Sequence, residues 1–314
     1  MPIIDSNADD THTVTVVTQP QHGSLTAVVD NVTHRVCITY KPVAGFTGND
    51  KAFVRVTDSG NLSSPNIEIP LFVNPGTCPT CLTMELKVLL EGPYNTATHK
   101  MNTTLNQRGL LPGQTPIGQF AVPTPAGQPY KTAPWNYTGT EALTTYDADI
   151  VDWVLVSLRT DAQTTTPVFR VAGLLHDDGR ITFVNPCFTI PDGQYHVVIE
   201  HRNHMGVMSP TKVAIANNKI FYDFTVQDSY TISDPPSFGQ IQIDGKWMMY
   251  GGDGKKDLFY DNFDVNFYDS KLWKDESGIF DQYRYGDFNL DADVNFNDSV
   301  LWKKNNGRYS KVPH

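Results

Sequence analysis

The sequence is poor in the patterns that mark membrane-spanning, nucleotide-binding or hydrolytic proteins. No run of about 18 apolar residues is present, so no segment is predicted to span a bilayer as a helix. Neither a glycine-rich phosphate loop nor a serine nucleophile elbow occurs. Basic residues are also few: 24 Lys and Arg stand against 34 Asp and Glu, giving a net charge of −10. This balance argues against nucleic acid or an anionic membrane as a partner.

Cysteine is scarce, and only Cys78-Pro-Thr-Cys81 among the four cysteines has a suggestive spacing. A structural zinc ion needs four ligands, and no second CxxC pair is present. A thioredoxin-like motif should open a helix after a strand, whereas this segment lies between two strand-like runs. A disulfide within the linker, or plain thiols, is therefore favoured over redox or zinc chemistry.

Strand and turn formers dominate what is present. Thr, Val, Asn, Gly and Pro are plentiful while Ala and Glu are sparse, which predicts a mainly β fold class. The 314 residues are enough for two or three domains.

Residues 1–75 contain short strand-like runs separated by turns, which predicts a β-sandwich. The runs cover residues 13–18, 36–40, 52–57 and 67–73. Four stretches then resemble, in order and spacing, the bacterial cadherin-like Ig repeat: Gln19–Leu25, Ile38–Pro42, Gly45–Asp50 and Val56–Gly60. The resemblance implies an Ig-like stalk domain, and because the pattern is entered late, one that is truncated at its N-terminus.

Residues 82–241 are predicted to form a larger antiparallel β-sandwich. Strand-like runs cover residues 84–90, 149–159, 169–175, 181–184 and 195–201, and residues 102–145 are expected to be long ordered loops. Several stretches are similar to large Bacteroidota-type, hemagglutinin-like surface proteins: Leu89–Tyr94, Gln128–Tyr130, Pro134–Tyr137, Val151–Val156 and Glu200–His204. The resemblance implies secretion and the bacterial cell surface, without implying an activity.

Residues 242–314 contain an internal duplication. Asp264–Gly278 matches Asp293–Gly307 at ten of fifteen positions, 29 residues later. Acid is crowded here as well, with 12 of the 34 acidic residues between Asp253 and Asp298. Such crowding is self-repelling unless cations are bound, although a solvated acidic face is the alternative.

The second copy fits a twelve-residue EF-hand loop, which takes oxygen ligands from positions 1, 3, 5, 7, 9 and 12. Asp293 would donate its backbone carbonyl, and Asp298 would stand at the start of a helix over residues 299–304. Calcium prefers several hard oxygen ligands, so Ca²⁺ is the predicted cofactor. The six predicted ligands are Asp287, Asn289, Asp291, Asp293, Asn295 and Asp298.

A duplicated loop–helix unit of this kind, with Asp at position 12, resembles a type I dockerin. The resemblance implies a small α-helical, EF-hand-like module over residues 242–314. Ala292 departs from the EF-hand pattern, which has Gly at that position, and predicts strain or an altered turn. The module is small and no cysteine follows Cys187, so it is expected to need metal for stability.

The first copy is a damaged loop. Aligned without a gap, it places Leu258 and Tyr260 where ligands are needed. However, Tyr250–Asp253 resembles Tyr285–Asp287, so the first loop is predicted to carry about six extra residues. The candidate ligands of this second, less regular site are Asp253, Asp257, Asp261, Asn262, Asp264, Asn266 and Asp269.

No catalytic residue is assigned. His201 and His204 lack the HEXXH spacing and, at a strand end, are expected to point to opposite sides as hydrogen-bonded edge residues. Asp149 with Asp152 could form a glycosidase pair, but the sequence indicates no cleft between them. Trp135, Tyr137 and Trp153 could line a sugar site, although buried core is the commoner role.

Two functions remain after these exclusions. The favoured one is a non-catalytic, calcium-binding C-terminal region of a large secreted bacterial cell-surface protein, acting in adhesion, anchoring or protein docking. Its expected partners are calcium and a cohesin-like or surface-anchoring protein, or a surface glycan. The alternative is the accessory tail of a secreted hydrolase, for example a glycan-degrading one, whose catalytic domain lies upstream.

Overall fold

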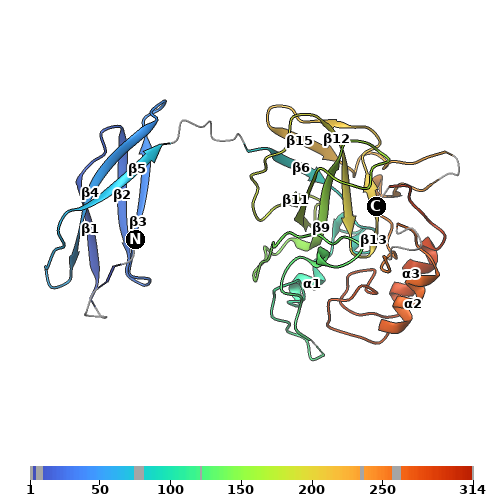
Figure 1. The fold of residues 1–314 in the computed structure, drawn as a ribbon. Coiled ribbons are helices and arrows are strands. Elements are labelled where there is room, and N and C mark those ends of the chain that lie inside the picture. Colours follow the sequence, from blue (N-terminus) through green and yellow to red (C-terminus); the bar gives the residue numbers. More distant parts are fainter. Residues whose placement is uncertain are drawn as a thin grey trace. The chain divides into compact units, whose positions relative to one another are not determined.

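The computed structural model describes residues 3–4, 10–73, 81–120, 122–233, 237–256 and 263–312. The chain divides once, into two compact units, Met1–Pro79 and Thr80–His314 (Figure 1). The expected boundary near residue 241 therefore does not separate two compact units. The reason is that Met248 and Met249 are fully buried in the same core cluster as Leu86 and Leu90.

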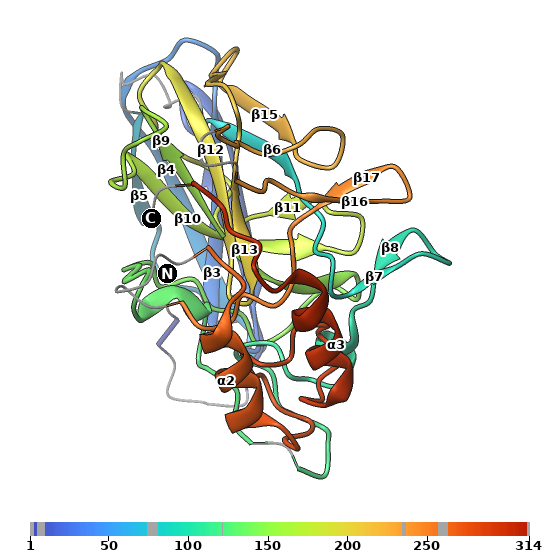
Figure 2. The same ribbon diagram turned by 90° about the vertical axis from the view of Figure 1, so that its right-hand side faces the viewer.

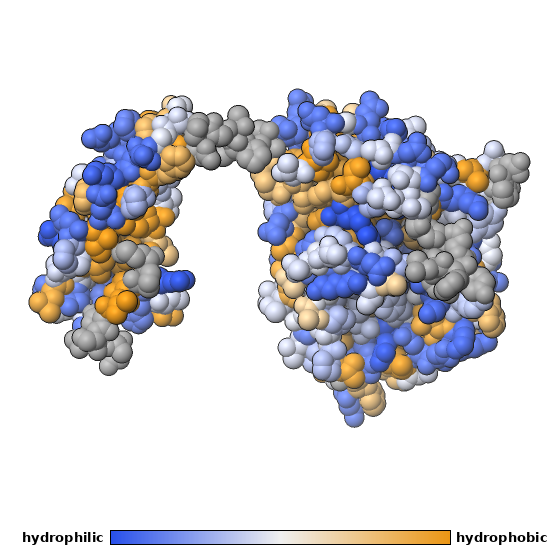
Figure 3. Space-filling model, viewed as in Figure 1, coloured by the Kyte–Doolittle hydropathy of each residue, from blue (hydrophilic) through white to orange (hydrophobic). Residues whose placement is uncertain are grey.

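The described part of the first unit forms five antiparallel strands. They are β1 (His12–Thr18), β2 (Gly23–Asp30), β3 (Arg35–Pro42), β4 (Gly48–Asp58) and β5 (Ile67–Val73). One sheet has the order β1-β4-β5, and β2 pairs with β3. Leu25, Ala52 and Val54 form the buried centre between the sheets. This core is thin, and apolar side chains also lie on the surface of the unit (Figure 3).

The Gly45–Asp50 stretch has a defined structural role in this unit. Asp50 accepts hydrogen bonds from the backbone N–H groups of Gln21 (2.9 Å) and His22 (2.8 Å) and from the hydroxyl of Tyr40 (2.9 Å). Burial raises the pKa of Asp50, but these hydrogen bonds to its charged form outweigh burial and lower that pKa to about 2. Asp50 thus ties the turn before β2 to the start of β4.

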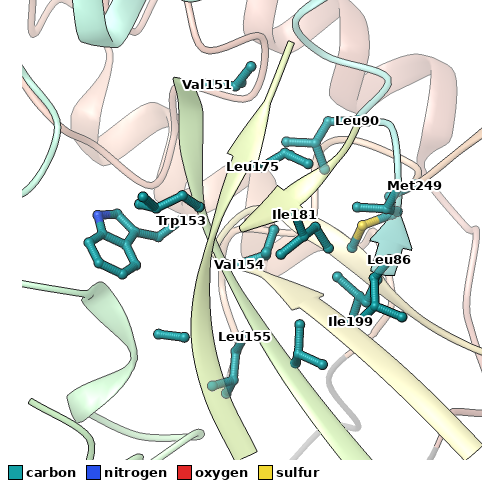
Figure 4. Close-up of a cluster of buried hydrophobic side chains, with 14 of the residues drawn as sticks. Leu86, Leu90, Val151, Trp153, Val154, Leu155, Leu175, Ile181, Ile199 and Met249 are labelled. Carbon is teal, nitrogen blue, oxygen red and sulfur yellow. The ribbon is translucent and has the colours of Figure 1, made fainter. Parts of the chain in front are cut away.

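The second unit is built on one antiparallel sheet with the order β11-β10-β9-β12-β13 and β14 beside β12. All ten residues of β9 are buried, since both faces of this central strand are covered. Figure 4 shows Trp153 on one side of the sheet, while Leu86, Ile181 and Met249 gather on the other. The strands are β9 (Ile150–Arg159), β10 (Phe169–His176), β11 (Ile181–Thr182), β12 (Gln194–His201), β13 (His204–Met208) and β14 (Val213–Ala214).

Short strands cover the second face of this sheet. β6 (Thr83–Lys87) pairs with β15 (Lys219–Asp223), and β16 (Ile241–Ile243) forms a hairpin with β17 (Lys246–Met248). The β6–β15 pair is parallel, so the expectation of a wholly antiparallel second sandwich is wrong at this point. The mainly β fold class is confirmed. A further small hairpin joins β7 (Tyr94–Asn95) to β8 (Lys100–Met101).

Helices are few and short. α1 (Thr104–Gln107) and the 3₁₀ turn η1 (Pro129–Lys131) lie in the long loops before β9. α2 (Phe267–Glu276) and α3 (Phe296–Asn305) lie side by side at one end of the second unit (Figures 1 and 2). No helix among the described residues is long and apolar enough to cross a membrane.

A disulfide joins Cys81 to Cys187, 106 residues apart in sequence. A Cys78–Cys81 disulfide within the linker is therefore excluded, because Cys81 has another partner; Cys78 itself lies outside the described residues. Cys37 is a free, exposed cysteine. A long-range disulfide of this kind is typical of proteins that fold in an oxidising compartment.

We expect Cys81→Ser/Cys187→Ser to lower the free energy of unfolding of the second unit by about 2–5 kcal/mol, because the disulfide closes a long loop in the unfolded chain. All 5 tryptophans follow residue 134 in sequence, so urea unfolding followed by tryptophan fluorescence reports this unit alone. Cys37→Ser is the matched control and should leave that transition unchanged. An unaltered midpoint in the double variant would contradict the prediction.

Candidate metal centre

The duplicated sequence forms two matching loop–helix units. Asn266 caps α2 and Asn295 caps α3, and each cap is a reciprocal capping box with the aspartate three residues later. In each box the asparagine side chain accepts a backbone N–H of the first turn, and Asp269 or Asp298 accepts the N–H of the capping residue. The sequence repeat at 29 residues is therefore also a repeat of local structure.

The two copies are joined by reciprocal hydrogen bonds. The indole N–H of Trp273 donates to the carbonyl of Asn295 at 2.7 Å, and that of Trp302 donates to the carbonyl of Asn266 at 2.8 Å. The backbone repeats this exchange, since Gly278 N–H donates to Val294 O (2.9 Å) and Gly307 N–H donates to Val265 O (2.7 Å). Each helix thus depends on the loop of the other copy for a hydrogen-bond partner of its tryptophan.

The second loop is organised by Asp287 and Asp298. Asp298 accepts the N–H groups of Phe288 (2.7 Å) and Asn289 (3.2 Å) on one oxygen and that of Asn295 (2.8 Å) on the other. Asp287 accepts the N–H groups of Asp291 (3.0 Å) and Ala292 (2.9 Å). Five backbone N–H groups of the loop therefore point at two carboxylates.

The turn within this loop uses left-handed backbone at residues other than glycine. Ala292 has φ 76° and Leu290 has φ 56°. Ala292 stands at the EF-hand glycine position, and the predicted strain is confirmed because the same left-handed turn is made with a side chain present. Such a conformation costs about 1–2 kcal/mol for an L-residue. The loop keeps the turn because Ala292 and Leu290 are buried in the core cluster of the unit.

Asp287 and Asp298 are both fully buried, and neither takes part in an ion pair between described residues. Burial raises the pKa of Asp287 well above its usual value, and the charges of Asp298 and Asp291 raise it further, while the charge of Arg202 offsets this only in part. Burial also raises the pKa of Asp298, to about 6. Buried carboxylates are normally neutralised by a cationic partner or a metal, so this donor set fits a hard divalent cation.

The other predicted ligands of the second loop are arranged unevenly. Asn289 donates to Asp291 at 2.8 Å, which places their side chains together. Asp293 instead turns its carboxylate to Arg108 (3.0 Å), and its carbonyl accepts the side-chain amide of Asn295 at 3.1 Å. The side chain of Asn295 serves as the helix cap. In the described ranges, no three His, Cys, Asp or Glu side chains are already gathered at metal-binding distances.

The first loop repeats the arrangement after its insertion. One oxygen of Asp269 accepts the N–H groups of Gly254 (2.8 Å) and Lys255 (2.8 Å), and the other accepts that of Asn266 (2.8 Å). These bonds match those of Asp298, so Asp253 corresponds to Asp287. Asp264 accepts from the Asn266 amide at 2.7 Å. Asp257, Asp261 and Asn262 lie outside the described residues.

The tip of the β12–β13 hairpin joins the two loops, a role that the sequence did not reveal. The amide of Asn203 donates to the carbonyl of Asp287 at 2.6 Å. Its own carbonyl accepts the N–H groups of Gly252 and Asp253, each at 3.2 Å. One residue therefore holds the first position of both loops. The only sequence signal was a polar run at a strand end.

His201 and His204 lie together, not on opposite sides as expected. They are register partners across a two-residue hairpin turn, so they share a face of the sheet. Their Nδ1 atoms are 3.1 Å apart, and both rings are fully buried. The Nε2 of His204 accepts the N–H of Gly92 at 3.1 Å, so its Nδ1 carries the proton and donates to Asn203 (2.9 Å). Both imidazoles have structural partners.

A buried ion pair anchors this hairpin tip. Arg202 Nε donates to Asp152 at 2.9 Å, and His201 Nε2 lies 3.2 Å from the same oxygen. The hydroxyl of Tyr283 donates to the other oxygen at 2.7 Å, and its ring lies 4.1 Å from the Arg202 guanidinium carbon. Burial raises the pKa of Asp152, but Arg202 and the hydrogen bonds outweigh burial and lower that pKa to about 2.

Glu91 makes a second buried attachment between the module and the sandwich. One of its oxygens pairs with Lys304 of α3 at 2.6 Å. The other accepts the N–H of Gly251 (3.1 Å) and the amide of Asn305 (2.5 Å). Nothing in the sequence near Glu91 pointed to this role, because its partners lie more than 150 residues away.

The acids and aromatic residues that were considered for catalysis or sugar binding have structural roles. Asp149 pairs with His176 at 2.8 Å, while Asp152 pairs with Arg202, so the two acids serve separate ion pairs. Trp135 and Trp153 are buried in the main core, and Tyr137 packs against it. Their expected role as sandwich core is confirmed.

Comparison with known proteins identifies one family and two structures. The sequence profile of the bacterial Ig domain matches residues 3–69, which lie in the first unit. Comparison with curated protein sequences finds no match.

Both matching structures are type II cohesin–X-dockerin complexes from Acetivibrio cellulolyticus. A chain of an N-terminal interface mutant aligns with a TM-score of 0.30 at 17% identity, covering 50% of this chain and 82% of that one. A chain of a C-terminal interface mutant aligns with a TM-score of 0.35 at 13% identity, covering 73% and 97%. At TM-scores this low, the similarity supports no conclusion about the fold or function of this chain.

We expect Asp152→Asn to lower the free energy of unfolding of the second unit by about 3–5 kcal/mol at neutral pH, because it leaves Arg202 buried and unpaired. Since the folded-state pKa of Asp152 is depressed to about 2, its stabilisation is complete above pH ~4 and is lost as the pH falls towards 2. Urea unfolding at a series of pH values should show the gap to wild type closing across that window. Asp178→Asn, at an exposed carboxylate, is the control. If Asp152→Asn lowers the free energy of unfolding no more than Asp178→Asn does, the prediction is contradicted.

Proposed function

We propose that this chain is a non-catalytic region of a bacterial surface protein in which a calcium-organised docking module is joined to β-sandwich domains. The observation that carries the proposal is the pair of fully buried carboxylates, Asp287 and Asp298, in a duplicated loop–helix unit without a cationic partner among the described ion pairs. Two neighbouring buried carboxylates repel each other, and a bound divalent cation would remove that repulsion.

The second loop is the proposed calcium site. Asp287, Asp291 and Asp298 would hold the ion through their carboxylates, with the Asn289 side chain and the Asp293 carbonyl as neutral oxygens. Bound calcium supplies positive charge and several oxygen-coordination sites to the loop. The chain itself supplies the left-handed turn at Ala292 and the buried hairpin tip that fixes Asp287.

The setting at a bacterial surface rests on other features. The bacterial Ig profile over residues 3–69 supports a stalk-like first unit. The Cys81–Cys187 disulfide supports folding outside the reducing cytosol. The candidate acids and histidines already serve structural contacts, which supports a non-catalytic role for this region. The alternative remains that a catalytic domain stands elsewhere in the same protein.

A docking face is proposed on the two helices. Phe267 and Phe296 occupy the same position in the two copies, at the first residue of α2 and of α3, and are 66% and 68% exposed. Interaction surfaces are marked by contiguous exposed apolar area, to which these two side chains on neighbouring helices would both contribute. The resemblance to dockerins favours a cohesin-like protein as the partner.

Calcium should raise the unfolding temperature of the second unit, by the equivalent of about 4 kcal/mol at ~1,000 times its dissociation constant. Because the module shares its core with the sandwich, the whole tryptophan-reported transition should move. The measurement is thermal unfolding followed by tryptophan fluorescence, with calcium and with chelator. Asp298→Ala should abolish the difference, whereas Asp275→Ala, at an exposed helix position, should retain it. Equal transitions for wild type in calcium and in chelator would refute the calcium site.

Replacing both Phe267 and Phe296 with Ser should abolish binding to a cohesin while leaving the calcium-dependent unfolding temperature unchanged, because both side chains are exposed. Surface plasmon resonance against a panel of immobilised type I and type II cohesins measures the binding. Phe221→Ser, at an exposed position on β15 (58%), is the matched control. Undiminished binding by the double variant would place the docking face elsewhere.

A further inference from the structure

Lys256 is a buried lysine inside the first loop. Its side chain is only 2% exposed, and its ammonium group forms an ion pair with Asp253, whose side chain is 1% exposed. The ammonium also donates to the carbonyl of His204 at 2.9 Å and lies 5.2 Å from the centre of the Phe263 ring. A lysine is almost never buried unless its charge is paired, so this contact is a built feature of the loop.

The position of this lysine is informative because Asp253 corresponds to Asp287. The correspondence follows from Asp269 and Asp298, which accept the two N–H groups after Asp253 and Asp287, respectively. The two equivalent carboxylates differ in their partner: Asp253 has an ammonium group, whereas Asp287 appears in no ion pair between described residues. Among the described residues, only the first copy therefore has an ion-pair partner for this carboxylate.

We infer that the ammonium group of Lys256 takes the place of the metal in the first loop, so that the chain binds one calcium ion, in the second loop, and not two. This inference rests on the proposed calcium site. An ammonium group can donate three hydrogen bonds, and two of them are used by Asp253 and the His204 carbonyl. Calcium takes six to eight oxygen ligands, and a fixed positive charge on the first of them excludes a second cation.

Other features of the first loop agree with this assignment. Position 3 of the loop, Asn289 in the second copy, is Lys255 in the first, and a lysine side chain cannot act as an oxygen ligand. The second oxygen of Asp253 is buried and has no hydrogen-bond partner among the described residues, so Lys256 is the contact that neutralises this carboxylate. Asp264 and Asp269 are the other acids near it, and both hold their own backbone or side-chain partners.

A lysine in place of the metal also makes the order of the first loop independent of the calcium concentration. A covalently attached cation is present at every calcium concentration, so the first copy keeps its neutral interior when calcium is removed. It can then continue to supply the Asn266 carbonyl to Trp302. The metal-free module is accordingly expected to lose order in the second loop alone.

Isothermal titration calorimetry of the full chain with calcium chloride gives the first test. One equivalent should bind to wild type and none to Asp298→Ala. Two equivalents for wild type would overturn the lysine assignment while leaving the calcium proposal intact. No binding at all would instead contradict the calcium proposal, and the inference about stoichiometry would then fail as well.

Thermal unfolding in chelator gives the second test. Lys256→Met leaves Asp253 buried without its cation, and the unfolding temperature of the second unit should fall by about 10 °C. Lys274→Met, at an exposed position on α2, should leave it unchanged. Asp253→Asn/Lys256→Met, which removes both charges, should recover most of the loss. If Lys256→Met unfolds like Lys274→Met, the ammonium group does not hold the first loop, and the inference fails.

Discussion

The ion pair between Asp152 and Arg202 fixes the point from which the rest of the second unit is organised. Two charges removed from water are unfavourable unless their other hydrogen-bonding groups are largely satisfied. His201 and Tyr283 satisfy Asp152, and Arg202 Nη1 donates to the Arg284 carbonyl, while Nη2 of Arg202 has no hydrogen-bond partner among the described residues. The pair locks the hairpin between β12 and β13, which places the next residue, Asn203, against both loops of the duplicated module. The helical module is therefore not an appendage, because its loops are completed by a strand connection of the sandwich.

This arrangement also explains how a small module with little apolar area is held. α2 and α3 contribute few buried apolar side chains of their own. Their stability comes from reciprocal contacts between the copies and from polar attachments to the sandwich at Asn203 and Glu91. A metal in the second loop and a lysine in the first would then solve one shared problem, the charge of an enclosed carboxylate, in two chemically different ways.

Local pattern predicted local structure well. The run at residues 67–73 is a strand with those bounds, and the duplication located α3 and its capping aspartate. Contacts between distant segments could not be predicted from the sequence pattern. The Cys81–Cys187 disulfide, the parallel pairing of β6 with β15 and the burial of Met249 in the sandwich core join residues more than 100 positions apart. The insertion in the first loop was predicted, but the partner of Asp253 was not, because a lysine in an acidic stretch looks like a surface residue.

The position of the disulfide determines which residues a pulling force on the chain can extend. Cys81 is the second residue of the second unit, so a pull on the chain from the first unit reaches it almost at once. The covalent bond passes that tension directly to Cys187, and the 105 residues between them, with strands β6 to β11, cannot be drawn out while the bond is intact. Extension would be confined to the segment after Cys187. The central strand β9 is thus shielded from a force that acts along the chain, independently of its hydrogen bonds.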